Sequence, residues 1–408
     1  MVNARVIIEG LRSGIPYRET AEAMTIGRQE NLKALATLME AVAQGRRPKL
    51  WGQVIRANYG EGKTHLMHAL ASLAWESNWV VSMISVSKET PLDSLDRIYP
   101  KLVMNAVRPG SNQAGLEPVV EEALRGPHLL AESRDVPLSD RVRALLDNLV
   151  RQNAGMELLM ADLHGQFMNL GDLKRIHREN FSKPLKIATS RIREEIPSYF
   201  ALVDWLITRA GYQGWLLLID EVELMGKFGR GARARSYANV GRILEGLGER
   251  TISVWAVAAN FQNDVIIQRK DLDQAPAWLL ARPKEAADAQ LAQLALEELS
   301  AARPLSRPNA AQIRELVERV YDLHQEAYDW SAPVPPDRFY EVVGEHIETV
   351  DARLRLWIRL AISILDLWRQ YGVEGFQVKA WQLKEVDLSE DDDEAADTDL
   401  IDRRALFE

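Results

Sequence analysis

The spacing of apolar residues separates short strand-like runs from long helical stretches. Four runs rich in Val, Ile, Leu and Trp predict buried strands at residues 50–55, 79–86, 214–220 and 251–259. Between the second and third runs, residues from about 90 to about 210 keep helical spacing almost throughout. A crossover between parallel strands needs only a dozen or more residues, so this stretch is predicted to be an insertion.

These runs predict an α/β fold, with a parallel sheet that carries helices on both faces. The continuous apolar run at 215–219 suits a central strand that is covered on both sides. Helical spacing returns from about 285 to 382 and predicts a C-terminal helical lid. The expected divisions are 1–285 for the sheet and its insertion, 286–384 for the lid, and 385–408 for a tail.

Residues 56–65 join the first predicted strand to a helical pattern and read Arg-Ala-Asn-Tyr-Gly-Glu-Gly-Lys-Thr-His. A strand, a glycine-rich turn and a helix that begins at Gly62 form the context of a phosphate-binding P-loop. Lys63 would reach the β- and γ-phosphates of a nucleotide, and the Thr64 hydroxyl would ligate Mg²⁺. Ala57 replaces the first glycine of the motif and fits there only with a negative φ. The residues predicted to contact the nucleotide are Asn58, Tyr59, Gly60, Glu61, Gly62, Lys63, Thr64 and His65.

A second motif follows the third apolar run, where two carboxylates, Asp220 and Glu221, end the strand. Open α/β sheets place their ligands at the carboxyl ends of strands. Asp220 would hold Mg²⁺ as a Walker-B carboxylate does, and Glu221 is the natural general base for an attacking water. Together with the P-loop, this pair predicts an ATP hydrolase that uses Mg²⁺.

Asn260 follows the fourth run, at the tip of that strand. An amide beside the γ-phosphate could orient the attacking water, whereas Asn at a strand end is equally common as a turn former. Both interpretations stay open at this point.

Residues 226–235 contain four basic residues, three glycines and no acid, which predicts a flexible and positive loop. The loop could be a solvated surface, could follow a DNA backbone, or could reach the ATP of a neighbouring subunit.

Composition narrows the class of protein. The chain has no cysteine, which excludes disulfides, thiol catalysis and Cys-ligated zinc. Its formal net charge of −9 arises between residues 385 and 408, where eleven acids stand against two arginines. This stretch predicts a solvated tail, with a nucleic-acid mimic or a docking tail as the alternative. No apolar run approaches the ~20 residues of a membrane span, and the N-terminus is charged, so we expect a cytoplasmic protein without a membrane partner.

The order of these elements resembles an AAA+ ATPase. More narrowly, several strings resemble the ATP-binding proteins of bacterial BREX phage-defence loci, the BrxD-like proteins. The strings are RVIIEGLRSGIP at 5–16, TIGRQE at 25–30, NYGEGKTHL at 58–66, LLLIDEVE at 216–223 and LHQEAYDW at 323–330.

The resemblance implies further roles. Gly27 and Arg28 resemble a segment that lies against adenine, Arg353 or Arg355 resembles the lid arginine that senses the γ-phosphate, and Asn260 occupies the sensor-1 place. It also implies a protein partner, a helicase or another protein of the defence locus, and leaves room for a homo-oligomer and for DNA.

Three functional hypotheses follow from these motifs. The first is an ATP hydrolase of anti-phage defence, stimulated by a partner or by DNA, whose nucleotide state orders the lid and controls that partner. The second is an ATP-gated loader or regulator with little hydrolysis of its own. The third is an AAA+ protein of replication or transposition.

Overall fold

The computed structural model describes residues 4–13, 21, 23–58, 61–125, 129–347 and 354–379. Contacts divide the chain into two compact units. The helical unit comprises Met1–Arg28, Gly60–His68 and Ser306–Glu408, and the sheet unit comprises Gln29–Tyr59 and Ala69–Leu305. The predicted acidic tail lies outside the described residues.

The sheet unit is built around six strands in the order β3-β2-β4-β5-β1-β6. Neighbouring long strands run parallel, with Ala57 opposite Ala258 and Ser85 opposite Asp220. The predicted α/β fold with a parallel sheet is therefore confirmed. Its four long strands are those predicted from the apolar runs: β1 (Gly52–Ala57), β2 (Val80–Ser85), β4 (Trp215–Asp220) and β5 (Thr251–Ala258).

Two strands of two residues each complete the sheet. β3 (Ala106–Val107) pairs antiparallel with β2, and β6 (Arg303–Pro304) pairs parallel with β1. Two residues carry no readable periodicity, so the apolar pattern did not predict them.

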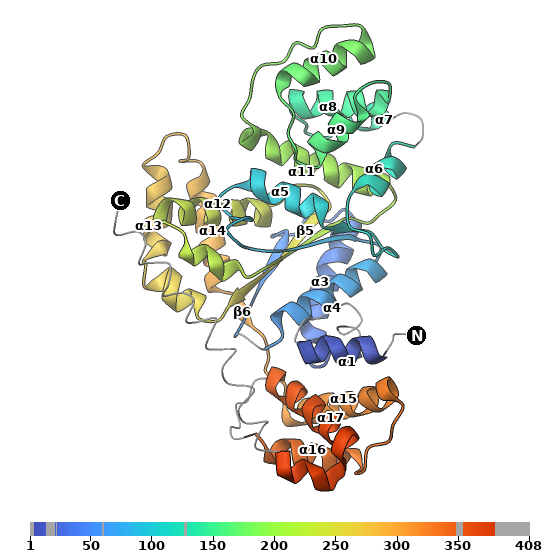
Figure 1. The fold of residues 1–408 in the computed structure, drawn as a ribbon. Coiled ribbons are helices and arrows are strands. Elements are labelled where there is room, and N and C mark those ends of the chain that lie inside the picture. The colour runs from blue at the N-terminus through green and yellow to red at the C-terminus, as the bar shows by residue number, and fades with distance from the viewer. Residues whose placement is uncertain are drawn as a thin grey trace, which may run out of the picture. The chain divides into compact units, whose positions relative to one another are not determined.

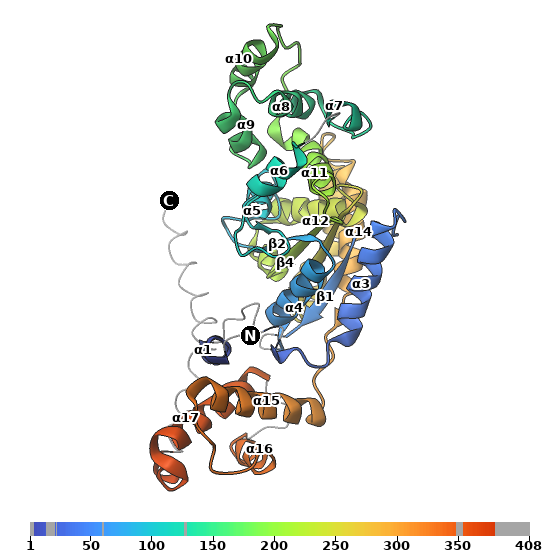
Figure 2. The same ribbon diagram turned by 90° about the vertical axis from the view of Figure 1, so that its right-hand side faces the viewer.

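Helices cover both faces of the sheet, and every residue of β4 and β5 is buried. One face carries α3 (Gln29–Ala43) and the part of α4 (Lys63–Glu76) that belongs to the sheet unit (Figures 1 and 2). The opposite face carries α12 (Arg230–Glu245), α13 (Asp271–Leu280) and α14 (Asp288–Ser300). α12 contacts β1 and β5, and α14 packs along α12. Because of these contacts α14 belongs to the sheet unit, while the predicted domain boundary at 285/286 stays a prediction.

The helical insertion lies between β2 and β4, as predicted. α5 and α6 each pack on α11, and α7 to α10 lie beyond them, away from the sheet (Figures 1 and 2). Inside the insertion, the buried Arg141 guanidinium donates to Asp162 at 2.7 Å and to the Tyr199 hydroxyl at 3.2 Å. The helices are α5 (Leu95–Met104), α6 (Glu117–Ala123), α7 (Leu129–Glu132), α8 (Asp140–Arg151), α9 (Met156–Leu163), α10 (Leu170–Phe181) and α11 (Ile192–Arg209).

The flexible loop predicted at 226–235 is wrong. A 3₁₀-helix, η1 (Val222–Lys227), follows β4, and α12 begins at Arg230. Arg233 is buried and donates through Nε and Nη2 to both oxygens of Asp271, each at 2.8 Å. This bidentate pair fixes the start of α12 against α13, which a local reading of the glycines does not reveal.

The helical unit packs four described helices around an apolar core that includes Ile8, Val317, Phe339 and Leu365. α1 contacts α15 and α17, and Glu9 and Arg12 of the N-terminal string both hydrogen-bond to Tyr328 of the string at 323–330. The helices are α1 (Ala4–Ser13), α15 (Ala310–Tyr328), α16 (Pro336–Glu345) and α17 (Leu354–Lys379).

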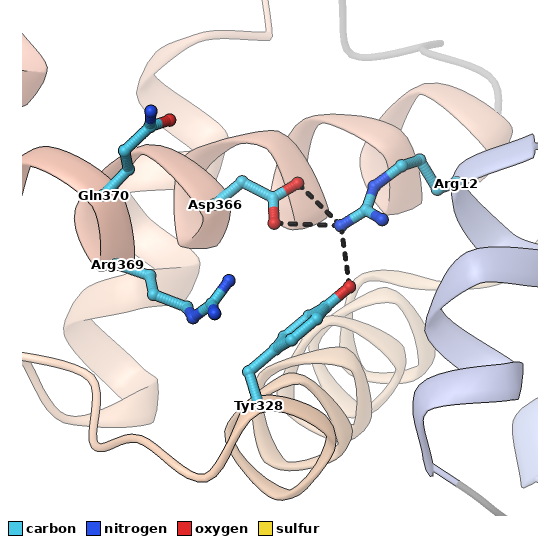
Figure 3. A pocket seen from close by; sticks show the side chains of 5 residues that line it. All are labelled: Arg12, Tyr328, Asp366, Arg369 and Gln370. Carbon is cyan, nitrogen blue, oxygen red and sulfur yellow. Dashed lines mark hydrogen bonds and ion pairs between the residues drawn. The ribbon is translucent and has the colours of Figure 1, made fainter.

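An open pocket of about 540 Å³ lies where α1, α15 and α17 meet (Figure 3). Arg12 donates to Asp366 at 2.9 Å and to the Tyr328 hydroxyl at 3.2 Å, and the Arg369 guanidinium lies 4.4 Å from the centre of the Tyr328 ring. These contacts hold α1 to the C-terminal helices. Among the helices described here, none has the length and apolar character that a bilayer crossing requires.

Candidate nucleotide-binding site

The carboxyl ends of three adjacent parallel strands, β4, β5 and β1, meet at one edge of the sheet. Asp220 ends β4, Asn260 follows β5, and Asn58 follows β1 as the first residue of the predicted P-loop. Ala57 is buried as the last residue of β1 and has no positive φ. An extended residue needs no glycine, so the strand accommodates the departure from the P-loop motif.

The P-loop reaches α4 as predicted, although Tyr59 and Gly60 lie outside the described residues. Gly62 has φ +86°, a conformation that glycine adopts without strain, and its carbonyl accepts the first helical bond from Leu66 at 2.9 Å. α4 begins at Lys63, which is buried, followed by Thr64. The first backbone N–H groups of a helix are not used within the helix, and they attract anions.

At the end of β4, the chain turns sharply between the two predicted carboxylates. Asp220 is buried, and its Oδ1 accepts the backbone N–H of Glu221 at 2.8 Å. Glu221 has φ +57°, a left-handed conformation that costs a residue with a Cβ roughly 1–2 kcal/mol. This strained turn leaves the Glu221 side chain exposed at the sheet edge. Strain of this kind concentrates at functional sites.

Glu223 is the competing candidate for general base, and its carboxylate is already engaged. Its Oε2 accepts the backbone N–H of Ala258 at 2.9 Å, at the end of β5. The bond ties η1 to the neighbouring strand, so Glu223 has a structural position while Glu221 faces solvent.

Asn260 is exposed in a turn between β5 and a π-helix, η2 (Gln262–Ile267). Its side-chain amide donates to Asp264 at 2.9 Å, and its carbonyl accepts the backbone N–H of Asp264 at 2.9 Å. These bonds fit a turn former, and the place beside Asp220 and the P-loop strand fits a water-orienting residue.

Within the helical unit, Arg28 hydrogen-bonds to the backbone of the predicted P-loop at Glu61. It is buried, and its guanidinium donates to the Ser306 carbonyl at 2.6 Å and to the Glu61 carbonyl at 2.8 Å. Burial lowers the pKa of Arg28. Both bonds go to backbone carbonyls, so Arg28 positions the loop and the segment that leads into α15.

Gly27 fits this arrangement for steric reasons. It has φ +68°, and a Cβ at this position would lie 2.8 Å from Nε2 of Gln312, in the first turn of α15. The positive φ favours glycine at this position, and any other residue would also require the Gln312 side chain to move.

Glu61 places a negative charge inside a loop that is predicted to bind phosphates. Its Oε1 lies 3.2 Å from Nε of Arg307, whose side chain is 63% exposed. Arg28 adds a second positive charge near the same carboxylate. Two arginines thus offset a charge that would otherwise repel a triphosphate.

His65 lies in the first turn of α4 and hydrogen-bonds to Thr25. The Thr25 hydroxyl donates to the Ala21 carbonyl at 2.6 Å, so its oxygen accepts a hydrogen bond from Nε2–H of His65 at 3.0 Å. Burial lowers the pKa of His65 to about 4, and the charges of Arg28 and His68 act in the same direction. His65 is therefore neutral near pH 7.

Of the two predicted lid arginines, Arg353 lies outside the described residues and Arg355 is exposed on α17. Sequence reasoning missed Thr25, which binds His65, Ser306, which accepts from Arg28, and Arg307, which pairs with Glu61. Arg307 stands 246 positions from its partner Glu61, and nothing local in the sequence links the two.

A parallel sheet in which a P-loop strand, a polar-tipped strand and an acid-tipped strand lie side by side defines a P-loop nucleoside-triphosphate-binding protein. The chain belongs to the family of BREX system ATP-binding proteins BrxC/D, whose sequence model matches residues 2–154 and 182–378. This match confirms the resemblance found in the sequence. No curated protein sequence matches the chain. The unmatched internal segment, 155–181, contains α9 and α10.

Proposed function

We propose that the chain binds ATP with Mg²⁺ and hydrolyses it, and that its nucleotide state controls a partner or DNA in anti-phage defence. The observation that carries this proposal is the sheet edge, where the P-loop strand ends two strands away from Asp220 and Glu221. The family match supports ATP binding and phage defence over the replication or transposition alternative.

Each proposed residue has a distinct task. Lys63 and the first N–H groups of α4 hold the phosphates. Glu221 takes a proton from the attacking water, as an exposed carboxylate that directly follows β4. Asn260 orients that water.

The oxygen ligands proposed for Mg²⁺ suit the chemistry of the ion. Asp220 offers a buried carboxylate at the sheet edge, and Thr64 offers a hydroxyl at the start of α4. Within the described ranges, no group of three or more His, Asp or Glu side chains gathers as a metal cage. Mg²⁺ is commonly held by one or two protein oxygens together with substrate phosphates, so this sparse donor set fits. The ion would neutralise charge that develops on the phosphates.

Calorimetry with Lys63→Ala tests nucleotide binding. The substitution removes a charge-assisted contact, so ATP affinity should fall by at least about tenfold while the melting temperature stays the same. Unchanged affinity would contradict the P-loop assignment.

An ATPase assay on the purified chain, with and without duplex DNA, tests hydrolysis. Turnover in either condition supports an enzyme. Tight ATP binding without turnover in both conditions favours the ATP-gated loader.

A further inference from the structure

α10 and the segment that follows it carry a local excess of positive charge. Between residues 171 and 193 there are seven Lys and Arg residues against two acids, in a chain whose formal net charge is −9. The basic residues are Lys174, Arg175, Arg178, Lys183, Lys186, Arg191 and Arg193. We call the surface formed by these seven residues the α10 surface.

Most of these charges are displayed to solvent without a counter-ion. All of them are exposed except Lys174, which is half-buried. Arg175 pairs with Asp172 and Glu179, and Arg193 pairs with Asp96. No carboxylate of the described residues forms an ion pair with the other five: Lys174, Arg178, Lys183, Lys186 and Arg191.

The local structure explains why these side chains face outward. On α10, Leu173 and Ile176 are buried, and Lys174 and Arg178 follow them one helical turn apart on one face. The chain then crosses to α11 without regular structure (Figure 1). Leu185 and Ile187 pack against the core of the sheet unit, so Lys186 between them is turned to solvent.

The composition of the α10 surface distinguishes nucleic acid from protein as its partner. Protein interfaces are organised around buried aromatic or aliphatic anchors. None of the large exposed hydrophobic residues in the described part of the chain lies between 171 and 193. Binding to a phosphate backbone requires only positioned cations, which release counterions as they neutralise phosphates.

We propose that the α10 surface binds the backbone of duplex DNA without sequence preference. This deepens the proposed function, because it places the DNA contact on the insertion in place of the basic stretch at 226–235, where Arg233 is buried against Asp271. Three of the seven cations, Lys174, Arg175 and Arg178, lie in the segment that the family model leaves unmatched, and the other four lie in the matched range.

The test measures binding of a labelled DNA duplex by fluorescence anisotropy across a salt series, without nucleotide. The variant replaces Lys183, Lys186 and Arg191 with Ala, and the control replaces Lys33, Arg46 and Arg47, which are also exposed cations of the sheet unit. Three lost phosphate contacts should weaken binding by at least about tenfold for every sequence and reduce the salt slope by about 2–3. The control should bind as the native chain does.

Calorimetry with ATP on the same variant separates this inference from the proposed function, because ATP binding should not change. If the variant binds DNA as tightly as the native chain, or if the control weakens equally, the proposal is overturned.

Binding of poly-L-glutamate tests whether the α10 surface binds an acidic protein in place of DNA. If this polymer binds the native chain and not the variant, while DNA binds both alike, the surface docks an acidic protein and the proposal is wrong. A chain truncated before residue 385 should bind DNA at least as tightly as the full chain. If truncation abolishes DNA binding, the contact requires the tail and the α10 surface does not suffice.

Discussion

Two ion pairs, one from each unit, hold their charges in different ways. In the sheet unit, Arg233 and Asp271 form a closed bidentate pair with side-chain exposures of 8% and 1%. In the helical unit, Glu61 pairs with Arg307, whose guanidinium remains mostly in water. A buried pair cannot separate without leaving an unsolvated charge, whereas an exposed pair exchanges partners at little cost. The first kind fixes the scaffold, and the second can exchange partners.

The largest expected effect comes from breaking the buried pair. Arg233→Ala leaves the Asp271 carboxylate buried without its guanidinium, which should reduce the free energy of unfolding by about 3–5 kcal/mol. Urea denaturation measures the loss. Arg230→Ala, an exposed position on the same helix, is the matched control and should change stability by less than about 0.5 kcal/mol. Equal losses in the two variants would show that burial does not distinguish these arginines.

A second prediction compares the two carboxylates after β4. Glu221→Gln keeps the shape of the side chain but cannot accept a proton, so turnover should fall by about 10²-fold or more while ATP stays bound. Glu223→Gln should instead lower thermal stability modestly, since its amide can still accept the Ala258 N–H through oxygen. ATPase rates and melting curves on both variants decide the assignment. Loss of turnover only in the Glu223 variant would reverse the two roles.

How far the sequence predicts this site depends on the range of each signal. The four long strands and the helix that begins at Lys63 were predictable because periodicity and motif spacing lie within about ten residues. The start of α12 was missed, because Gly229 and Gly231 suggest a loop while the residue that fixes the helix, Asp271, is 38 positions from Arg233. The contacts of Arg28 with Glu61 and Ser306 were unreadable for the same reason. A contact between residues that are far apart in the sequence produces no local pattern, whereas the spacing of apolar residues in a strand or helix does.

The third prediction concerns pH, since His65 is held neutral in the folded state. Its pKa is lowered from 6.5 to about 4, so between these values the unfolded chain binds the proton more readily. The stabilisation is present above pH 6.5 and is lost as the pH falls toward 4. Through the titration of His65 alone, we expect the free energy of unfolding to be about 2 kcal/mol lower at about pH 5 than at about pH 7. Denaturation of the native chain and of His65→Gln at both pH values measures this contribution of His65. Glutamine can still donate to Thr25 but does not titrate. An identical loss in the variant would assign the pH dependence to other groups.

The smallest predicted effect concerns the exposed ion pair between Glu61 and Arg307. If Arg307 serves to neutralise the carboxylate of Glu61, Arg307→Ala should weaken ATP binding by about tenfold, because Arg28 alone then offsets the negative charge of the loop. Glu61→Gln removes the charge that needs compensation, so ATP affinity in that variant should equal or exceed the native value.

The double variant, Glu61→Gln with Arg307→Ala, carries the decision. Rescue of ATP affinity by the second substitution is expected only if the arginine acts through the carboxylate, since an arginine that touched phosphate directly could not be replaced in this way. Arg314→Ala on α15, whose partner Asp337 is 82% exposed, is the control and should leave affinity unchanged. Added salt should reduce the effect of Arg307→Ala, because it weakens the interaction between exposed charges. The Debye length is about 10 Å at 0.1 M ionic strength and shortens as the salt concentration rises. A tenfold loss that persists in the double variant would place Arg307 on the nucleotide and not on Glu61.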